Sequence, residues 1–199
     1  IASVMADFEK SGDYNYVFGF EESYGYNVET DVRDKDGVSA AAMCAEMTLY
    51  WRAKGKSLLQ RLEELFLQFG YFEDRSISKN FAGAAGVATM RGIMARLREE
   101  GLKTLGGQRV ASIRDIQTST CYDPANPSDK KPVDLPKSNV LQFFTEDGTK
   151  VSVRPSGTEP KIKFYFGVCA PLCCTARFDD VQAELDAKIE AIKKELNLI

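Results

Sequence analysis

Histidine is absent from all 199 residues of this sequence. Its absence excludes imidazole metal ligands, a histidine general base and any nucleophile that a neighbouring histidine would activate. Long apolar runs are also absent, because Glu46, Arg52 and Lys54 interrupt the apolar stretches well short of the roughly 18 residues that a membrane-spanning helix needs. The sequence therefore predicts a protein with no membrane partner.

Paired cysteine motifs are missing as well. The five cysteines form neither C-x-x-C pairs nor the even, regular set of a disulfide framework. Such a pattern is typical of unpaired thiols in a reducing compartment, so the expected location is the cytoplasm. The cysteines are Cys44, Cys121, Cys169, Cys173 and Cys174.

An excess of positive charge is lacking too. The chain has 26 basic and 29 acidic residues, for a formal net charge of −3. Non-specific binding to nucleic acid requires a basic face, so no nucleic-acid partner is expected. A local cluster of cations around one anion site remains compatible with this balance.

Apolar residues recur at helical spacing in several segments, and their stripes are expected to be core positions. Asp36 is a plausible N-cap for one of these helices. The predicted helices cover residues 1–8, 36–50, 58–69, 84–100 and 178–196.

Strand-like alternation is concentrated in the second half of the chain. The predicted strands are residues 14–20, 109–113, 139–144, 150–153 and 162–168. Residues 146–149 are a hairpin turn signal, and the proline-rich residues 119–138 predict a long loop. Because helices dominate before Gly106 and strands after it, we expect two domains, residues 1–105 and 106–199.

Residues 154–163 form the most informative stretch of the chain, with the sequence Arg-Pro-Ser-Gly-Thr-Glu-Pro-Lys-Ile-Lys between two strands. A glycine-centred turn can point successive N–H groups into one concavity that binds an anion. Ser156 and Thr158 add hydroxyls, and the Arg154 guanidinium suits a phosphate. The alternative is a hairpin turn with its charges in water.

A second candidate site follows the aromatic strand. The carboxylates of Glu21 and Glu22 and the hydroxyl of Ser23 could bind sugar hydroxyls at a strand end. The alternative is an acidic, solvated turn. Lys35, which stands between Asp34 and Asp36, could serve proton transfer or phosphate charge, or could be a surface lysine.

Together these two loops resemble the α-D-phosphohexomutases, the phosphoglucomutase/phosphomannomutase family. The likeness extends through residues 33–37, 105–107 and 139–141, and so spans nearly the whole chain. It implies a fold that is α/β plus α+β. The remainder of a mixed α/β, sugar-binding mutase domain would occupy residues 1–105. A small, phosphate-binding domain with an antiparallel sheet and helices on one face would occupy residues 106–199.

The resemblance implies interconversion of hexose 1-phosphate and hexose 6-phosphate through a phosphoserine and a bisphosphate intermediate. Within it, Glu21 and Ser23 would contact the O3 and O4 hydroxyls, and Lys35 would lie near the ligand as a catalytic candidate. The residues implied to hold the non-transferring phosphate are Arg154, Ser156, Gly157, Thr158 and Lys163. A single phosphate cradle with contacts to two adjacent hydroxyls can serve a sugar that binds in two opposite orientations.

Two family loops have no counterpart in this sequence: the phosphoserine loop of the type T-x-S-H-N-P and the Mg²⁺ loop of the type D-G-D-x-D-R. We therefore expect a C-terminal fragment that binds a phosphorylated hexose without turnover, and Mg²⁺ bound by the full-length protein but not by this fragment. The expected partners are the missing N-terminal domains and, through uncovered apolar surface, a second copy of the fragment.

Two other functions are compatible with parts of the sequence. A glycosidase could use Glu21 or Glu22, but adjacent carboxylates cannot flank a glycosidic bond, and the phosphate loop would be unexplained. A non-catalytic phosphosugar-binding module remains open. The loop with paired glutamates followed by Tyr-Gly is more similar to phosphoglucomutases than to mannose- or glucosamine-specific relatives, but it leaves the preferred hexose undecided.

Overall fold

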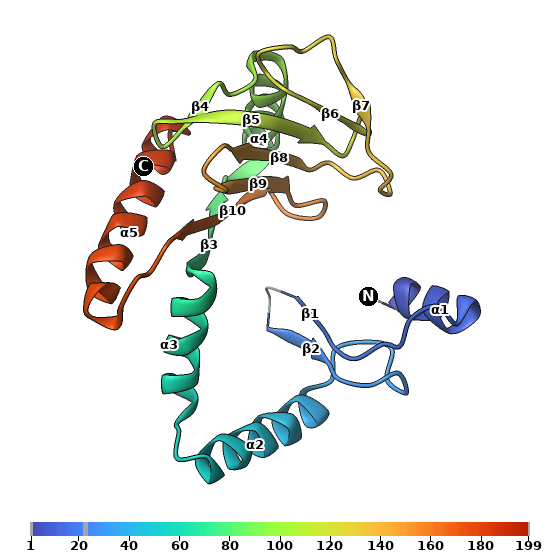
Figure 1. The fold of residues 1–199 in the computed structure, drawn as a ribbon. Helices are drawn as coiled ribbons and strands as arrows, with labels where there is room; N and C mark the ends of the chain where they lie inside the picture. Colours follow the sequence, from blue (N-terminus) through green and yellow to red (C-terminus); the bar gives the residue numbers. More distant parts are fainter. Residues whose placement is uncertain (1, 22–23, 199) are drawn as a thin grey trace. The chain divides into compact units, whose positions relative to one another are not determined.

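The computed structural model describes residues 2–21 and 24–198, with only the backbone described at residue 84. The chain divides into two compact units after Glu64 (Figure 1). Helix α3 (Leu58–Phe69) crosses this division. The domain boundary expected between residues 105 and 106 stays a prediction. Among the described residues, no helix combines the length and the apolar character needed to cross a membrane.

In its described residues, the first unit contains helices α1 and α2, the start of α3 and a small hairpin. Helix α1 spans Ala2–Ser11 and α2 spans Gly37–Ala53, while β1 (Gly19–Glu21) pairs antiparallel with β2 (Gly25–Asn27). The predicted N-cap is confirmed: the Asp36 carboxylate accepts hydrogen bonds from the backbone N–H groups of Val38 and Ser39, at 3.0 and 2.9 Å. These bonds satisfy donors that the first turn of a helix cannot pair internally.

Two expectations for this unit are wrong. The strand predicted from residue 14 begins only at Gly19, and Val17 before it is 78% exposed. The apolar stripe of α2 is not part of a core, since no residue of that helix is buried and Val38 and Leu49 are 81% and 67% exposed. Helical spacing shows that apolar residues share a face, but burial also requires another element packed against that face.

The second unit is built on one antiparallel sheet with the strand order β3-β10-β9-β8-β5-β6-β7, to which β4 adds by pairing with β5. The strands are β3 (Tyr71–Asn80), β4 (Thr104–Leu105), β5 (Gln108–Asp115), β6 (Thr120–Tyr122), β7 (Lys131–Pro132), β8 (Leu141–Thr145), β9 (Lys150–Pro155) and β10 (Lys161–Ala170). The four strands predicted after Gly106 each overlap an observed strand: β5, β8, β9 and β10, respectively.

Two helices cover one face of this sheet, as the family resemblance implied. Helix α4 spans Gly83–Glu100, and α5 spans Phe178–Glu195 after a short 3-10 turn, η1 (Thr175–Arg177) (Figure 1). Their predicted stripes are buried together with alternate residues of the strands. This core includes Met90, Met94, Leu97, Val151, Val153, Ile162, Phe164, Phe166, Val168, Leu185, Ile189 and Ile192. The opposite face of the sheet carries the polar residues of the same strands.

Strand β3 was not predicted. It pairs with β10 along its whole length, from Asn80 opposite Lys161 to Tyr71 opposite Ala170. Its residues are mostly polar and exposed because it is an edge strand, so it lacks the apolar alternation by which the central strands were identified. The predicted loop 119–138 likewise contains the short strands β6 and β7.

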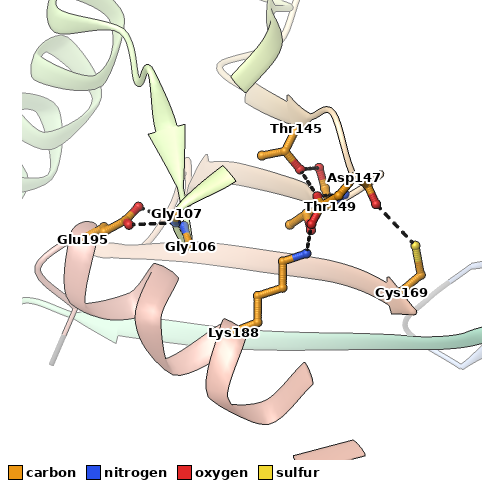
Figure 2. A network of polar contacts seen from close by, with 8 residues as sticks. All are labelled: Gly106, Gly107, Thr145, Asp147, Thr149, Cys169, Lys188 and Glu195. Atoms are coloured by element: carbon orange, nitrogen blue, oxygen red, sulfur yellow. Dashed lines mark hydrogen bonds and ion pairs between the residues drawn. The ribbon is translucent and has the colours of Figure 1, made fainter. Parts of the chain in front are cut away.

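A polar network ties α5 to the sheet (Figure 2). The Asp147 carboxylate, in the turn between β8 and β9, accepts hydrogen bonds from the Thr145 hydroxyl at 2.5 Å and the Thr149 N–H at 3.2 Å, and forms an ion pair with Lys188 of α5. At the end of α5, the Glu195 carboxylate accepts hydrogen bonds from the backbone N–H groups of Gly106 and Gly107, at 3.0 and 3.2 Å. The first link anchors the turn between β8 and β9, and the second anchors the turn between β4 and β5.

Candidate functional site

The loop predicted to bind phosphate joins β9 to β10. In the ladder, Arg154 lies directly opposite Lys163, so both side chains project from the same face of the sheet. A hydrogen bond from the Ser156 N–H to the Lys161 carbonyl, at 2.8 Å, closes the loop. Two like charges directly opposite each other destabilise a sheet, and an anion placed between them removes that repulsion.

Backbone N–H groups converge inside this loop. The Ser156 Oγ accepts from the N–H of Thr158 at 3.4 Å and from the N–H of Glu159 at 3.2 Å. Gly157 does not adopt the left-handed conformation of a glycine-centred nest, and a Cβ there would meet nothing within 4 Å. The serine hydroxyl therefore organises the convergence, and the glycine leaves open space beside it. Both donors are engaged by the Ser156 Oγ in this structure, and a phosphate oxygen could take the place of that hydroxyl as their acceptor.

The charges of the loop are unequally paired. Lys161 forms an ion pair with Glu159. The hydrogen bond from Lys161 to this carboxylate, together with the charges of Lys161 and Lys163, holds the pKa of Glu159 below its usual range. Within the described residues, Arg154 and Lys163 form no ion pair. Arg154 and Lys163 are therefore available for a ligand.

Two hollows border the loop. One, of about 490 Å³, is lined by all five residues predicted to bind phosphate and by Tyr165, among others. A second, of about 310 Å³, separates the loop from α4 and is lined by Arg91, Met94 and Asn139 among others. Tyr165 was missed, although the alternation that places Lys163 on this face also places Tyr165 there. No sequence signal connected Arg91 with the loop.

Phe81, between β3 and α4, holds the far end of the loop. The Phe81 N–H donates to the Pro160 carbonyl at 2.8 Å. A Cβ at Gly86, in the first turns of α4, would lie 2.6 Å from the Phe81 Cβ, so the helix packs against Phe81 only because this position is glycine. The loop is thus held by the β9–β10 ladder and by Phe81, which packs against the first turns of α4.

The predicted sugar-binding residues lie in the first unit. Glu21 ends β1, and its carboxylate lies 3.6 Å from the Lys35 ammonium, which also donates to Asp34 at 3.2 Å. The aliphatic stem of Lys35 crosses the hairpin, where a Cβ at Gly25 would lie 2.0 Å from the Lys35 Cδ. The structure therefore brings together Glu21 and Lys35. Ser23 lies outside the described residues.

The environment of Lys35 keeps it charged. The hydrogen bond with Asp34 and the negative charges of Asp34 and Glu21 raise the pKa of Lys35 above its ordinary value. The Lys35 backbone N–H and ammonium in turn lower the pKa of Asp34. A permanently charged ammonium can stabilise phosphate charge, whereas proton abstraction would require a lowered pKa.

Asn27, which was not predicted as a functional residue, positions this segment. It is 2% exposed, and its amide donates to the carbonyls of Val32 and Asp34 at 2.5 and 2.9 Å. The backbone carbonyl of Asn27 accepts a hydrogen bond from the Tyr16 hydroxyl at 3.0 Å. These bonds fold residues 28–35 back onto the β1–β2 hairpin and so place Lys35 over it.

The described residues do not fit a magnesium ion. They contain no group of three or more Asp, Glu, Cys or His side chains that could hold a metal. Asp34 is bound by Lys35, and Asp36 caps α2, so neither has oxygens directed towards a shared ion.

Two family models match the chain. Domain III of phosphoglucomutase/phosphomannomutase, an alpha/beta/alpha domain, matches residues 2–69. The C-terminal domain of the same family, domain IV, matches residues 85–188 and so more than half of the chain.

Curated relatives agree with these matches. A phosphoglucomutase of Staphylococcus aureus strain MRSA252 is 35% identical over 175 residues, which cover 88% of this chain and 30% of the relative. One from Staphylococcus epidermidis is 35% identical over 155 residues, 78% of this chain and 28% of the relative. The chain thus spans under a third of the length of these relatives.

A solved structure shows the same fold. The open form of parafusin from Paramecium, described as a phosphoglucomutase, aligns with a TM-score of 0.55 and covers 97% of this chain and 33% of its own, at 15% identity. The phosphate loop with its opposed cations and the matches over both halves lead to one conclusion: this chain belongs to the phosphoglucomutase/phosphomannomutase family and corresponds to its domains III and IV.

Proposed function

We propose that this chain is the phosphate- and sugar-binding portion of a mutase that interconverts hexose 1-phosphate and hexose 6-phosphate through a phosphoserine and a bisphosphate intermediate. The observation that carries the proposal is the cross-strand pair Arg154–Lys163 beside the converging N–H groups of the loop. A guanidinium can bind two phosphate oxygens in a fork, the ammonium adds charge, and the N–H groups bind a third oxygen.

The second part of the proposal concerns the sugar. Glu21 would accept hydrogen bonds from the sugar hydroxyls, together with Ser23. The Lys35 ammonium lies 3.6 Å from the Glu21 carboxylate and would keep it in place, and its charge would stabilise a nearby phosphoryl group. The raised pKa of Lys35 supports this electrostatic role over a role as a general base.

The remaining elements of the reaction are assigned to other parts of the full-length mutase. We propose that the phosphoserine and Mg²⁺ belong to its other domains, which are the partners of this chain, and that the protein acts in the cytoplasm. On this proposal the isolated chain binds substrate without turning it over. A non-catalytic phosphosugar-binding module would make the same contacts, so activity is the property that separates the two.

Isothermal titration of the purified chain with glucose 1-phosphate tests the binding. We expect Arg154→Met to weaken binding about tenfold or more, because it removes a charge-assisted pair of hydrogen bonds. Lys137→Met, which removes an exposed loop cation, is the matched control and should leave the affinity unchanged. Glucose without phosphate should give no measurable heat. We call Arg154 and Lys163 the phosphate clamp. Equal affinity of the Arg154 variant and the wild type would refute the assignment of this clamp.

A coupled assay for glucose 6-phosphate tests the second claim. The chain alone should give no conversion of glucose 1-phosphate, whereas the full-length protein should give conversion. Turnover by the chain alone would contradict the assignment of the phosphoryl donor to another domain. Comparing the full-length protein on glucose, mannose and glucosamine 1-phosphates determines the hexose preference.

A further inference from the structure

The polar face of the large sheet carries a run of cations that the proposed clamp does not use. On the four consecutive strands β10, β9, β8 and β5, no acidic residue shares this face, and both helices of the unit lie on the other face. The cations on this face are Lys161, Lys163, Arg154, Lys150 and Arg114. Lys161 forms an ion pair with Glu159, and Arg154 and Lys163 form the proposed clamp. The two cations that remain are Lys150 and Arg114.

These two cations converge on one aromatic ring. The Arg114 guanidinium carbon lies 5.1 Å from the centroid of Phe144, and the Lys150 Nζ lies 6.0 Å from the same centroid. The register explains this convergence. Lys150 is directly opposite Phe144, and Arg114 lies one strand to the other side of β8, in the neighbouring row. Each cation gains modestly from the ring, while the two repel each other.

Neutral hydrogen-bonding groups complete the surface. Gln142 lies opposite both Arg114 and Ser152, and its amide donates to the Ser152 hydroxyl at 3.4 Å. Neither Arg114 nor Lys150 forms an ion pair within the described residues, and the Arg114 Nε is buried without a hydrogen-bond partner. On the neighbouring strand β3, Asp74 lies across Gly167 from Lys150.

From this arrangement we infer that Arg114 and Lys150, above Phe144 and beside Gln142 and Ser152, form a second anion site for the phosphoryl group of a small phosphorylated metabolite. We call these five residues the anion platform. A dianionic group between the two cations removes their repulsion and accepts hydrogen bonds from the guanidinium, while the ring forms an apolar floor. The platform shares no residue with the clamp, so the inference does not depend on the proposed function.

A titration of the ¹⁵N-labelled chain with inorganic pyrophosphate, followed by NMR at constant ionic strength, tests the inference. We expect two groups of signals to saturate: the amides of the clamp loop and the amides of Phe144 and Lys150, with the Arg114 Nε–H. Sodium nitrate at the same ionic strength should produce neither response.

Variants separate the two sites. Arg114→Met and, independently, the exposed Lys150→Met should each weaken the platform response about tenfold and leave the clamp response unchanged. Arg154→Met should do the reverse, and Lys137→Met should change neither. Shifts at Phe144 that do not saturate, or that survive both platform substitutions, would overturn the inference. A saturating platform response with no clamp response would uphold it and instead refute the proposed function.

Discussion

Replacing Asp147 with asparagine is the substitution whose effect can be worked out most fully from the structure. Burial alone would raise the pKa of this carboxyl, but the Lys188 ion pair and the hydrogen bonds from Thr145 and Thr149 outweigh it and lower the pKa to about 2 from 3.8. The side chain is 32% exposed, so solvent screens part of the interaction. Asp147→Asn keeps the shape of the side chain and removes its charge.

The magnitude follows from the pKa difference. One pKa unit corresponds to about 1.4 kcal/mol, so the shift corresponds to at most about 2.5 kcal/mol, and screening reduces this to about 1 to 2 kcal/mol. Because the folded-state pKa is depressed, this stability is fully present above pH 3.8 and is lost as the pH falls through about 2. We therefore expect Asp147→Asn to lower the free energy of unfolding at pH 7, and the difference from wild type to vanish near pH 2.

Denaturant titration with hydrogen exchange on peptides of α5 and β8 measures this effect. The only tryptophan, Trp51, lies in the first unit, so its fluorescence serves as an internal control that should not change. Lys188→Met removes the same ion pair from the other side, and the double variant should be less destabilised than the sum of the singles. Asp134→Asn, in an exposed loop, is the matched control. A difference between wild type and Asp147→Asn that is constant from pH 7 to pH 2 would refute the reasoning.

Three further substitutions test the structure elsewhere. Arg98→Ala leaves Asp115, which is 5% exposed, without its ion pair and should destabilise the second unit by about 3 to 5 kcal/mol, measured by thermal unfolding. Gly106→Ala should be at least about 1 kcal/mol more destabilising than Gly107→Ala, since both glycines have positive φ but only at Gly106 would a Cβ contact α5, at 3.0 Å; equal effects would contradict this. Asp36→Ala should cost about 1 kcal/mol and speed amide exchange in the first turn of α2; unchanged exchange there would count against the cap.

The sequence predicted elements well where burial and periodicity agree. The stripe of α5 and the alternation of β10 were both identified, and both are buried in the core because each faces the other element. Prediction failed where tertiary context decides. The edge strand β3 has no apolar alternation to reveal it, and the stripe of α2 is apolar without being buried.

The candidate site shows the same division. The composition of the phosphate loop indicated an anion site, and local hydrogen bonding by Ser156 could be anticipated from its residue type. The sequence could not show that Arg154 and Lys163 are cross-strand neighbours and that Lys161 is already paired, because those facts depend on register. The role of Asn27 in placing Lys35 was equally invisible.

By itself, the sequence determined the family, the order of the sugar and phosphate loops, and which residue types could bind a phosphorylated sugar, because these depend on the identity and spacing of neighbouring residues. Only the tertiary structure decided which charges remain unpaired, because pairing depends on distances between strands and helices far apart in the chain. The same register that completes the clamp also brings Arg114 and Lys150 to one ring, 36 positions apart in the sequence.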